Sequence, residues 1–144
     1  MRPSPRRALL TLGALCVVLG GLVAAATGPL DWAKGSWAAA YLVLVVGVAQ
    51  YVMGWMHRDR DDRDVPGWTQ LAAWNVGSLL VIGGTLAATP LVVDLGSVLL
   101  VLALVLGALA TRSRSGGVVL AHRAMLLVLA VSIPVGIMLS HLRN

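Results

Sequence analysis

Two methionines and a histidine form the closest approach to a metal-binding pattern in this sequence. The segment MGWMH places Met53, Met56 and His57 at positions i, i+3 and i+4 of a helix, on one face. Thioethers and an imidazole are ligands that suit Cu(I). Alternatively, His57 and His122, near the ends of their helices at comparable depth, could hold a haem or a metal. The simpler interpretation, which the sequence favours, is interfacial histidines and lipid-facing methionines.

A second candidate group consists of polar side chains inside long apolar runs. Gln50 and Asn75 each lie about seven residues, or roughly 10 Å, from the same end of their predicted helices. A carboxamide in an apolar environment needs a hydrogen-bond partner. We therefore predict a Gln50–Asn75 hydrogen bond between two helices, with the indole N–H of Trp74 as a possible third member. In this interpretation Asn75 serves to join two helices, and binding a ligand is the less favoured role.

Tyr41 and Asp94 form a similar pair near the opposite end. Each follows the predicted start of its helix by about four residues, which places both about 6 Å inside the apolar layer. A Tyr41 hydroxyl that donates to the Asp94 carboxylate would satisfy both groups. Asp94 is the only acidic residue within a predicted segment, and ionisable groups in such positions are candidates for proton or ion handling. A satisfied structural acid is the alternative.

The sequence contains none of the common catalytic motifs. HExxH, GxSxG, GxxxxGK[ST] and CxxC are all missing. Asp94 has no second acid at its depth, and no histidine matches the depth of Ser78 or Ser97. The sequence therefore favours a protein that is not an enzyme.

Small residues recur where helices could approach one another closely. NVGSLL, which starts at Asn75, and DLGSVL, which starts at Asp94, share a polar residue followed by Gly-Ser and aliphatic residues. The pairs Gly20-Gly21 and Gly83-Gly84 have the same character. Glycine lets helix backbones come together, so all four places predict tight helix contacts.

The composition is that of a membrane protein. Of 144 residues, 58 % are hydrophobic and only 12 % are charged, about half the charged fraction of a soluble domain. The net charge of +5 does not indicate nucleic-acid binding, because the arginines fall in short clusters between apolar segments. Cys16 is the single cysteine and therefore cannot form an internal disulfide. We interpret it as a buried hydrophobic residue.

Five segments are long enough to span a bilayer, which takes about 20 apolar residues. One continuous helix over 68–110 would be about 65 Å long, twice the hydrocarbon thickness, so we predict a hairpin at Thr89-Pro90. The predicted fold is all-α: a single domain over 1–144 with five transmembrane helices at about 8–26, 37–56, 68–88, 91–110 and 119–139.

The basic residues predict the orientation of these helices. With the N-terminus in the cytoplasm, nine of the eleven Lys and Arg residues fall on the cytoplasmic side, and only Lys34 and Arg143 lie outside. The C-terminus is then on the outer side of the membrane. A cleaved signal peptide ending near Ala24–Ala26 is the alternative for the first segment, although its apolar run is longer than usual for such a peptide.

The stretches GSWAAAYLVLVVGVAQ, AAWNVGSLLV, LVVDLGSVLLV and AVSIPVG resemble those of small multi-pass integral membrane proteins of actinobacteria. The resemblance covers most of the chain from Gly35 onward. It implies five helices in a bacterial inner membrane. That family carries no assigned activity, so the resemblance implies no catalytic residue.

Together these features predict a non-enzymatic accessory or scaffold subunit without a cofactor. Its partners would be the lipid bilayer and other membrane subunits or further copies of itself, and not nucleic acid. A small oligomeric transporter or channel component that uses Asp94, with Asn75 and Gln50 lining a path, is the first alternative. A haem- or copper-binding membrane protein is the second.

Overall fold

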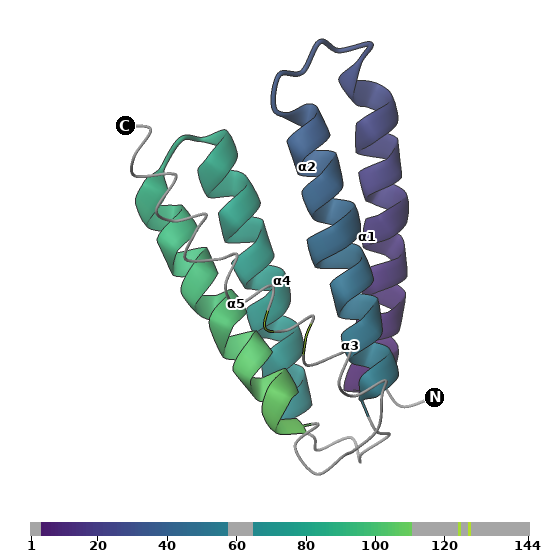
Figure 1. The fold of residues 1–144 in the computed structure, drawn as a ribbon, viewed down its shortest axis with the longest axis vertical. Helices are drawn as coiled ribbons and strands as arrows, with labels where there is room; N and C mark the ends of the chain where they lie inside the picture. The colour runs from purple at the N-terminus through teal and green to yellow at the C-terminus, as the bar shows by residue number, and fades with distance from the viewer. Residues whose placement is uncertain (1–3, 58–64, 111–123, 125–126, 128–144) are drawn as a thin grey trace. The chain divides into compact units, whose positions relative to one another are not determined.

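The computed structural model describes residues 4–57, 65–110, 124 and 127, and these residues form helices and turns without a strand (Figure 1). The chain divides into two compact units between Asp64 and Val65. The described part of each unit is one helical hairpin: the N-terminal hairpin within 1–64 and the second hairpin within 65–144. The all-helical class predicted from the sequence is confirmed for this part of the chain.

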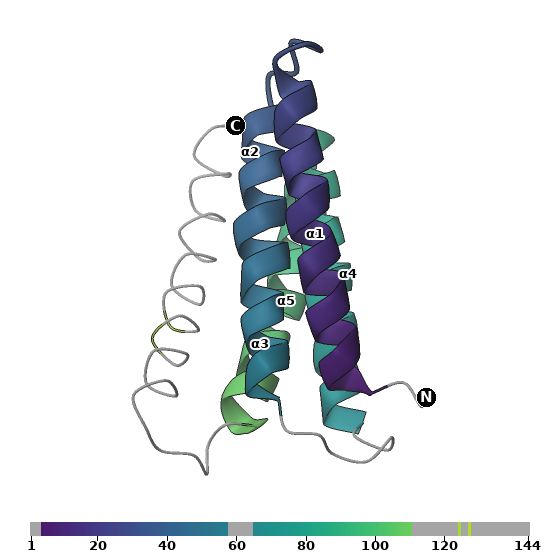
Figure 2. The same cartoon turned by 90° about the vertical axis from the view of Figure 1, so that its right-hand side faces the viewer.

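The N-terminal hairpin pairs α1 (Pro5–Thr27) with a continuous helical run. That run consists of α2 (Gly35–Tyr41), a π-helical segment η1 (Leu42–Ala49) and α3 (Gln50–Met56). Figures 1 and 2 show α1 beside this run along its length. The two are antiparallel because only the short connection 28–34 separates them.

Local signals in the sequence fix both ends of α1. Ser4 caps its first turn, since the Ser4 Oγ accepts a hydrogen bond from the backbone N–H of Arg7 at 3.4 Å. At the other end Asp31 adopts a left-handed conformation with φ of 47°. The backbone N–H of Trp32 then donates to the carbonyl of Thr27 at 3.1 Å. This arrangement satisfies a terminal carbonyl and reverses the chain.

The π-helical segment keeps one face of the second run against α1. The positions that meet α1 include Ala39, Val43, Gly47 and Tyr51, which recur every four residues. In an α-helix with 3.6 residues per turn, each four-residue step would rotate the contact by about 40°. The wider turns of Leu42–Ala49 offset that rotation. The sequence analysis did not predict this segment.

The second hairpin consists of α4 (Val65–Leu86) and α5 (Pro90–Ala110). Ala88 has a left-handed φ of 52°, and the backbone N–H of Thr89 donates to the carbonyl of Gly84 at 2.8 Å. Proline then opens α5, where its missing N–H leaves no hydrogen bond unmade. The turn therefore lies at Thr89-Pro90, where the sequence predicted a hairpin.

The helical runs of the described part begin and end within three residues of four of the predicted ranges. Four such runs are present among the described residues. The fifth predicted helix, at 119–139, lies outside them apart from Ala124 and Leu127. The number of five helices and the positions of the termini relative to a membrane stay predictions.

Three helices of the described part are long and apolar enough to cross a membrane: Pro5–Thr27, Gly35–Met56 and Pro90–Leu109. The 22-residue α4 is not among them. Its interior carries Gln70 and Asn75, which lower its hydropathy. The described residues are therefore compatible with a membrane protein.

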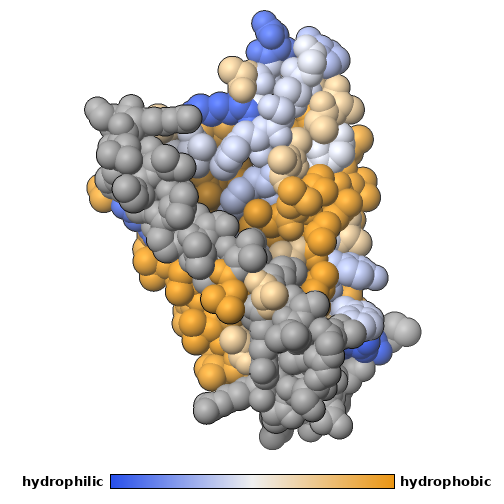
Figure 3. Space-filling model, in the orientation of Figure 1, coloured by the Kyte–Doolittle hydropathy of each residue, from blue (hydrophilic) through white to orange (hydrophobic). Residues whose placement is uncertain are grey.

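Both hairpins bury glycines between their helices, and many of their large hydrophobic side chains are exposed. In α1, Gly13 and Gly20 are buried, whereas Leu15 and Leu22 are more than half exposed. On the face shown in Figure 3, hydrophobic side chains cover the sides of the helices, and hydrophilic ones gather toward the α1–α2 connection. A helix in water places its leucines against the core instead.

Candidate functional site

The two Gly-Ser motifs meet each other inside the second hairpin. A methyl group added to Gly77 would lie 2.8 Å from the carbonyl oxygen of Gly96, and one added to Gly96 would lie 2.6 Å from the carbonyl oxygen of Gly77. The contact is reciprocal, so the two similar segments cross about a local pseudo-two-fold axis. Both glycines were predicted to permit close helix approach, and here they provide it to each other.

Glycines seven residues apart hold the N-terminal hairpin together in the same way. Gly13 and Gly20 on α1 face the second run, where Gly47 and Gly54 face α1. The spacing of seven returns a residue to one helix face after two turns. These four glycines therefore form a continuous close contact between the two helices.

Of the two Gly-Gly pairs singled out in the sequence, one glycine of each makes a helix contact. Methyl groups added to Gly20 and Gly84 would lie within 3 Å of the neighbouring helix, whereas Gly21 and Gly83 have open space around them. The prediction is thus right for half of each pair. Adjacent residues on a helix point about 100° apart, so only one can face the partner helix.

Three buried side chains with polar atoms lie along one face of α4. Gln70, Trp74 and Ser78 are four residues apart, and each is only 1 % exposed. Gln70 lies over Gly107 of α5, where a methyl group would come within 2.6 Å of the Gln70 Nε2. The sequence analysis missed Gln70 because it lies only two residues inside the predicted start of its helix. The four-residue spacing with Trp74 was the signal that could have found it.

Asn75 is half-buried next to Trp74 on α4 and forms a hydrogen bond within its own helix. Its Nδ2 donates to the carbonyl of Leu71 at 2.8 Å. Gln50, on α3, is fully buried, and its Oε1 and Nε2 have no hydrogen-bond partner within the described part of the chain. A Gln50–Asn75 bond would join the two units, and it stays a prediction.

Tyr41 and Asp94 also belong to different units, so their pairing stays a prediction too. The Tyr41 ring lies 5.4 Å from that of Trp37, with 34° between the planes. Asp94 is half-buried on α5, two residues before the glycine that contacts α4. Both residues lie toward the end of their hairpin predicted to face outward.

The methionines near the end of α3 do not face outward. Met53 and Met56 are buried, which corrects the interpretation of lipid-facing side chains, and His57 ends the helix half-buried. His122 lies outside the described residues. Within those residues, three or more His, Cys, Asp or Glu side chains do not gather at one place. Haem or copper binding by this group stays a prediction.

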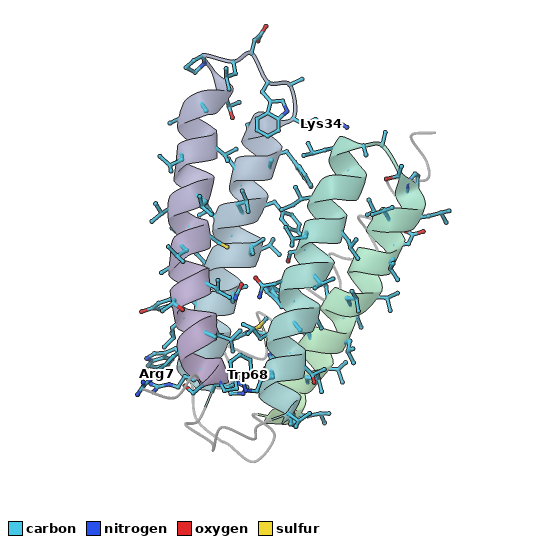
Figure 4. All side chains as sticks on the ribbon, turned by 180° about the vertical axis from the view of Figure 1, so that it is seen from behind. Arg7, Lys34 and Trp68 are labelled. Carbon is cyan, nitrogen blue, oxygen red and sulfur yellow. The ribbon has the colours of Figure 1, made fainter. Side chains whose placement is uncertain are left out.

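Charged residues mark the ends of the N-terminal hairpin. Figure 4 shows Arg7 near the start of α1 and Lys34 in the connection at the opposite end. In the second hairpin, Trp68 lies near the start of α4, away from the α4–α5 turn. Charges and tryptophans at helix ends with apolar sides between them are what a helix crossing a bilayer requires.

Comparison of the chain with protein-family models, with curated proteins and with solved structures finds no significant match. The resemblance to small actinobacterial membrane proteins therefore stays a prediction, and the function has to be argued from the helices themselves.

Proposed function

We propose that this chain is a multi-pass protein of a bacterial inner membrane and acts as a non-enzymatic accessory or scaffold subunit. The observation that carries the proposal is the packing of both hairpins, with glycines at the helix contacts and many leucines and valines exposed. Small residues let helices pack closely in lipid, where there is no water to drive leucines together. Large apolar surfaces remain for lipid and for helices of other subunits.

The proposed topology has five helices, a cytoplasmic N-terminus and an outer C-terminus. Nine basic residues against two support this orientation. Arg7 and Lys34 lie at opposite ends of the N-terminal hairpin, as expected for a helix pair that crosses the bilayer. A periplasm-active alkaline phosphatase fused after Asn144 should be active, and the same fusion after His57 should be inactive. An inactive fusion at the C-terminus would overturn either the orientation or the odd number of helices.

The accessory role is tested by native mass spectrometry of the chain released gently from its own membranes. We expect added mass that corresponds to another membrane polypeptide in fixed stoichiometry. The matched variants are Leu15→Ala and Leu22→Ala, which alter the outward face of α1, against Gly21→Ala as a control at a position with open space. A bare monomer or a pure homo-oligomer in all preparations would contradict the proposal.

The second candidate function is transport or conduction through an oligomer. The observation that favours it is the half-buried carboxyl group of Asp94, two residues from the glycine that meets α4. Its test is ion or proton flux in proteoliposomes. Loss of flux in Asp94→Asn would support it, and equal flux in the two proteins, or none in either, would eliminate it.

The third candidate, a haem or copper protein, rests on buried Met53 and Met56 beside His57. An absorption spectrum with a Soret band, or stoichiometric copper by elemental analysis, would support it. Loss of the signal in His57→Ala and His122→Ala would then assign the ligands.

A further inference from the structure

Ser78 differs from four other hydroxyl-bearing residues inside the helices of the described part. Thr11, Thr27, Thr69 and Ser97 each donate a hydrogen bond to the carbonyl four residues earlier, at 2.7 to 2.9 Å. The Ser78 Oγ makes no such bond and has no other hydrogen-bond partner among the described residues. A hydroxyl that does not use the local carbonyl is available to something else.

The indole of Trp74 is in the same situation one helical turn away. Its Nε1 is buried and also has no partner within the described ranges. Residues at i and i+4 lie on the same helix face, with about 5–6 Å between their Cβ atoms. Trp74 and Ser78 therefore lie on one face of α4, one turn apart, and an oxygen atom within about 3 Å of both polar atoms would bind both.

The chemistry of the two groups limits what can bind them. An indole N–H only donates, whereas a hydroxyl both donates and accepts. The ligand therefore needs an acceptor atom for Trp74 and either a donor or an acceptor for Ser78. Because both side chains are only 1 % exposed, the ligand must also be very small.

We propose that Trp74 and Ser78 bind one buried water molecule beside the Gly77–Gly96 contact. The indole N–H donates to the water oxygen, and the water donates to the Ser78 Oγ. Immobilising a water costs less free energy than leaving two polar groups unpaired in an apolar interior. The site goes beyond the proposed accessory role and does not depend on it.

The test is nuclear magnetic resonance of the full chain in lipid nanodiscs with ¹⁵N-labelled tryptophan. The Trp74 indole signal is assigned from Trp74→Phe or, if that variant does not fold, by elimination from the other four Trp→Phe variants. We expect a cross-peak between the Trp74 indole proton and water whose sign reports a long-lived bound molecule. The cross-peak should fall severalfold in Ser78→Ala and stay unchanged in Ser97→Ala, whose hydroxyl is engaged with its own helix.

Two further variants separate water from other partners. Ser78→Thr keeps the hydroxyl but fills the space, so it should displace the water; a cross-peak that survives there would come from the hydroxyl proton and would overturn the proposal. Gln50→Met removes the other fully buried polar side chain whose hydrogen-bonding atoms have no partner among the described residues. If the chemical shift of the Trp74 indole proton moves in Gln50→Met to the value of an indole without a hydrogen bond, the Trp74 partner is the Gln50 side chain and not water. That result would overturn the proposal. A missing cross-peak in the unaltered chain would also overturn the proposal.

Discussion

Two adjacent glycines in α1 allow a direct test of how the N-terminal hairpin is held together. A methyl group on Gly20 would lie 2.6 Å from Cγ2 of Val43. It would also lie 3.0 Å from the Val43 backbone nitrogen and 3.0 Å from the carbonyl oxygen of Ala39. A methyl group on Gly21 would meet nothing within 4 Å. The variants Gly20→Ala and Gly21→Ala thus make the same chemical change at two positions of one helix that point about 100° apart.

The expected effects follow from two terms. Alanine improves helix propensity by about 1 kcal/mol over glycine at either position. At Gly21 this term stands alone, so the variant should be more stable by about 1 kcal/mol. At Gly20 the helices must separate to admit the methyl group, and overpacking of this kind costs about 1–3 kcal/mol. The propensity term cancels in the difference, which leaves Gly20→Ala about 1–3 kcal/mol less stable than Gly21→Ala.

The assay is reversible unfolding of the chain in mixed micelles, followed by tryptophan fluorescence as the fraction of denaturing detergent rises. Gly84→Ala and Gly83→Ala repeat the comparison in the second hairpin, where Gly84 lies 2.9 Å from the Val93 backbone by the same measure and Gly83 has open space. If both members of each pair change the free energy of unfolding by the same amount, the close glycine contacts do not hold the hairpins.

Three further predictions address single features of the second hairpin in the same unfolding assay. Ala88→Gly should stabilise it by about 0.5–1 kcal/mol, since φ is 52° at this turn and glycine accepts a left-handed conformation without strain; an unchanged midpoint would refute the strain. Asn75→Ala should cost less than about 1 kcal/mol, as expected for one hydrogen bond to its own helix; a larger loss would reveal a partner on another helix. Gly96→Ala should destabilise by at least about 1 kcal/mol more than Gly107→Ala, because the first methyl group meets backbone and the second meets the end of a long side chain; equal losses would contradict this ranking.

The helix positions could be predicted because they depend on local and general physics. Apolar runs of about 20 residues and a proline at position 90 were enough to place four helical runs within three residues. The π-helical segment Leu42–Ala49 could not be placed in this way, because it depends on how the helix faces α1. The four-residue repeat of Ala39, Val43 and Gly47 carries that information, but it can be read only when the partner helix is known.

The candidate polar residues were found more easily than their partners. Asn75 donates to the carbonyl of Leu71 in its own helix, a bond that the sequence analysis did not predict although a helical side chain can reach the carbonyl four residues earlier. Met53 and Met56 were expected to face lipid because apolar side chains tolerate it, but both are buried. Residue type alone does not distinguish the inward from the outward face of a helix that is apolar all round.

The exposed surface of α5 gives the strongest argument about its solvent. Leu91, Leu95, Val98 and Leu109 are 82 %, 58 %, 65 % and 56 % exposed. Burying the exposed two thirds of these four side chains is worth about 4–8 kcal/mol in water, which is comparable to the whole stability of a small soluble domain, about 5–15 kcal/mol. Meanwhile polar Gln70 and Ser78 are buried on α4. A chain stabilised in water would gain by exchanging these two sets of positions. In a bilayer the exposed leucines cost nothing, and the polar side chains gain by being inside, so the arrangement itself favours lipid around α5.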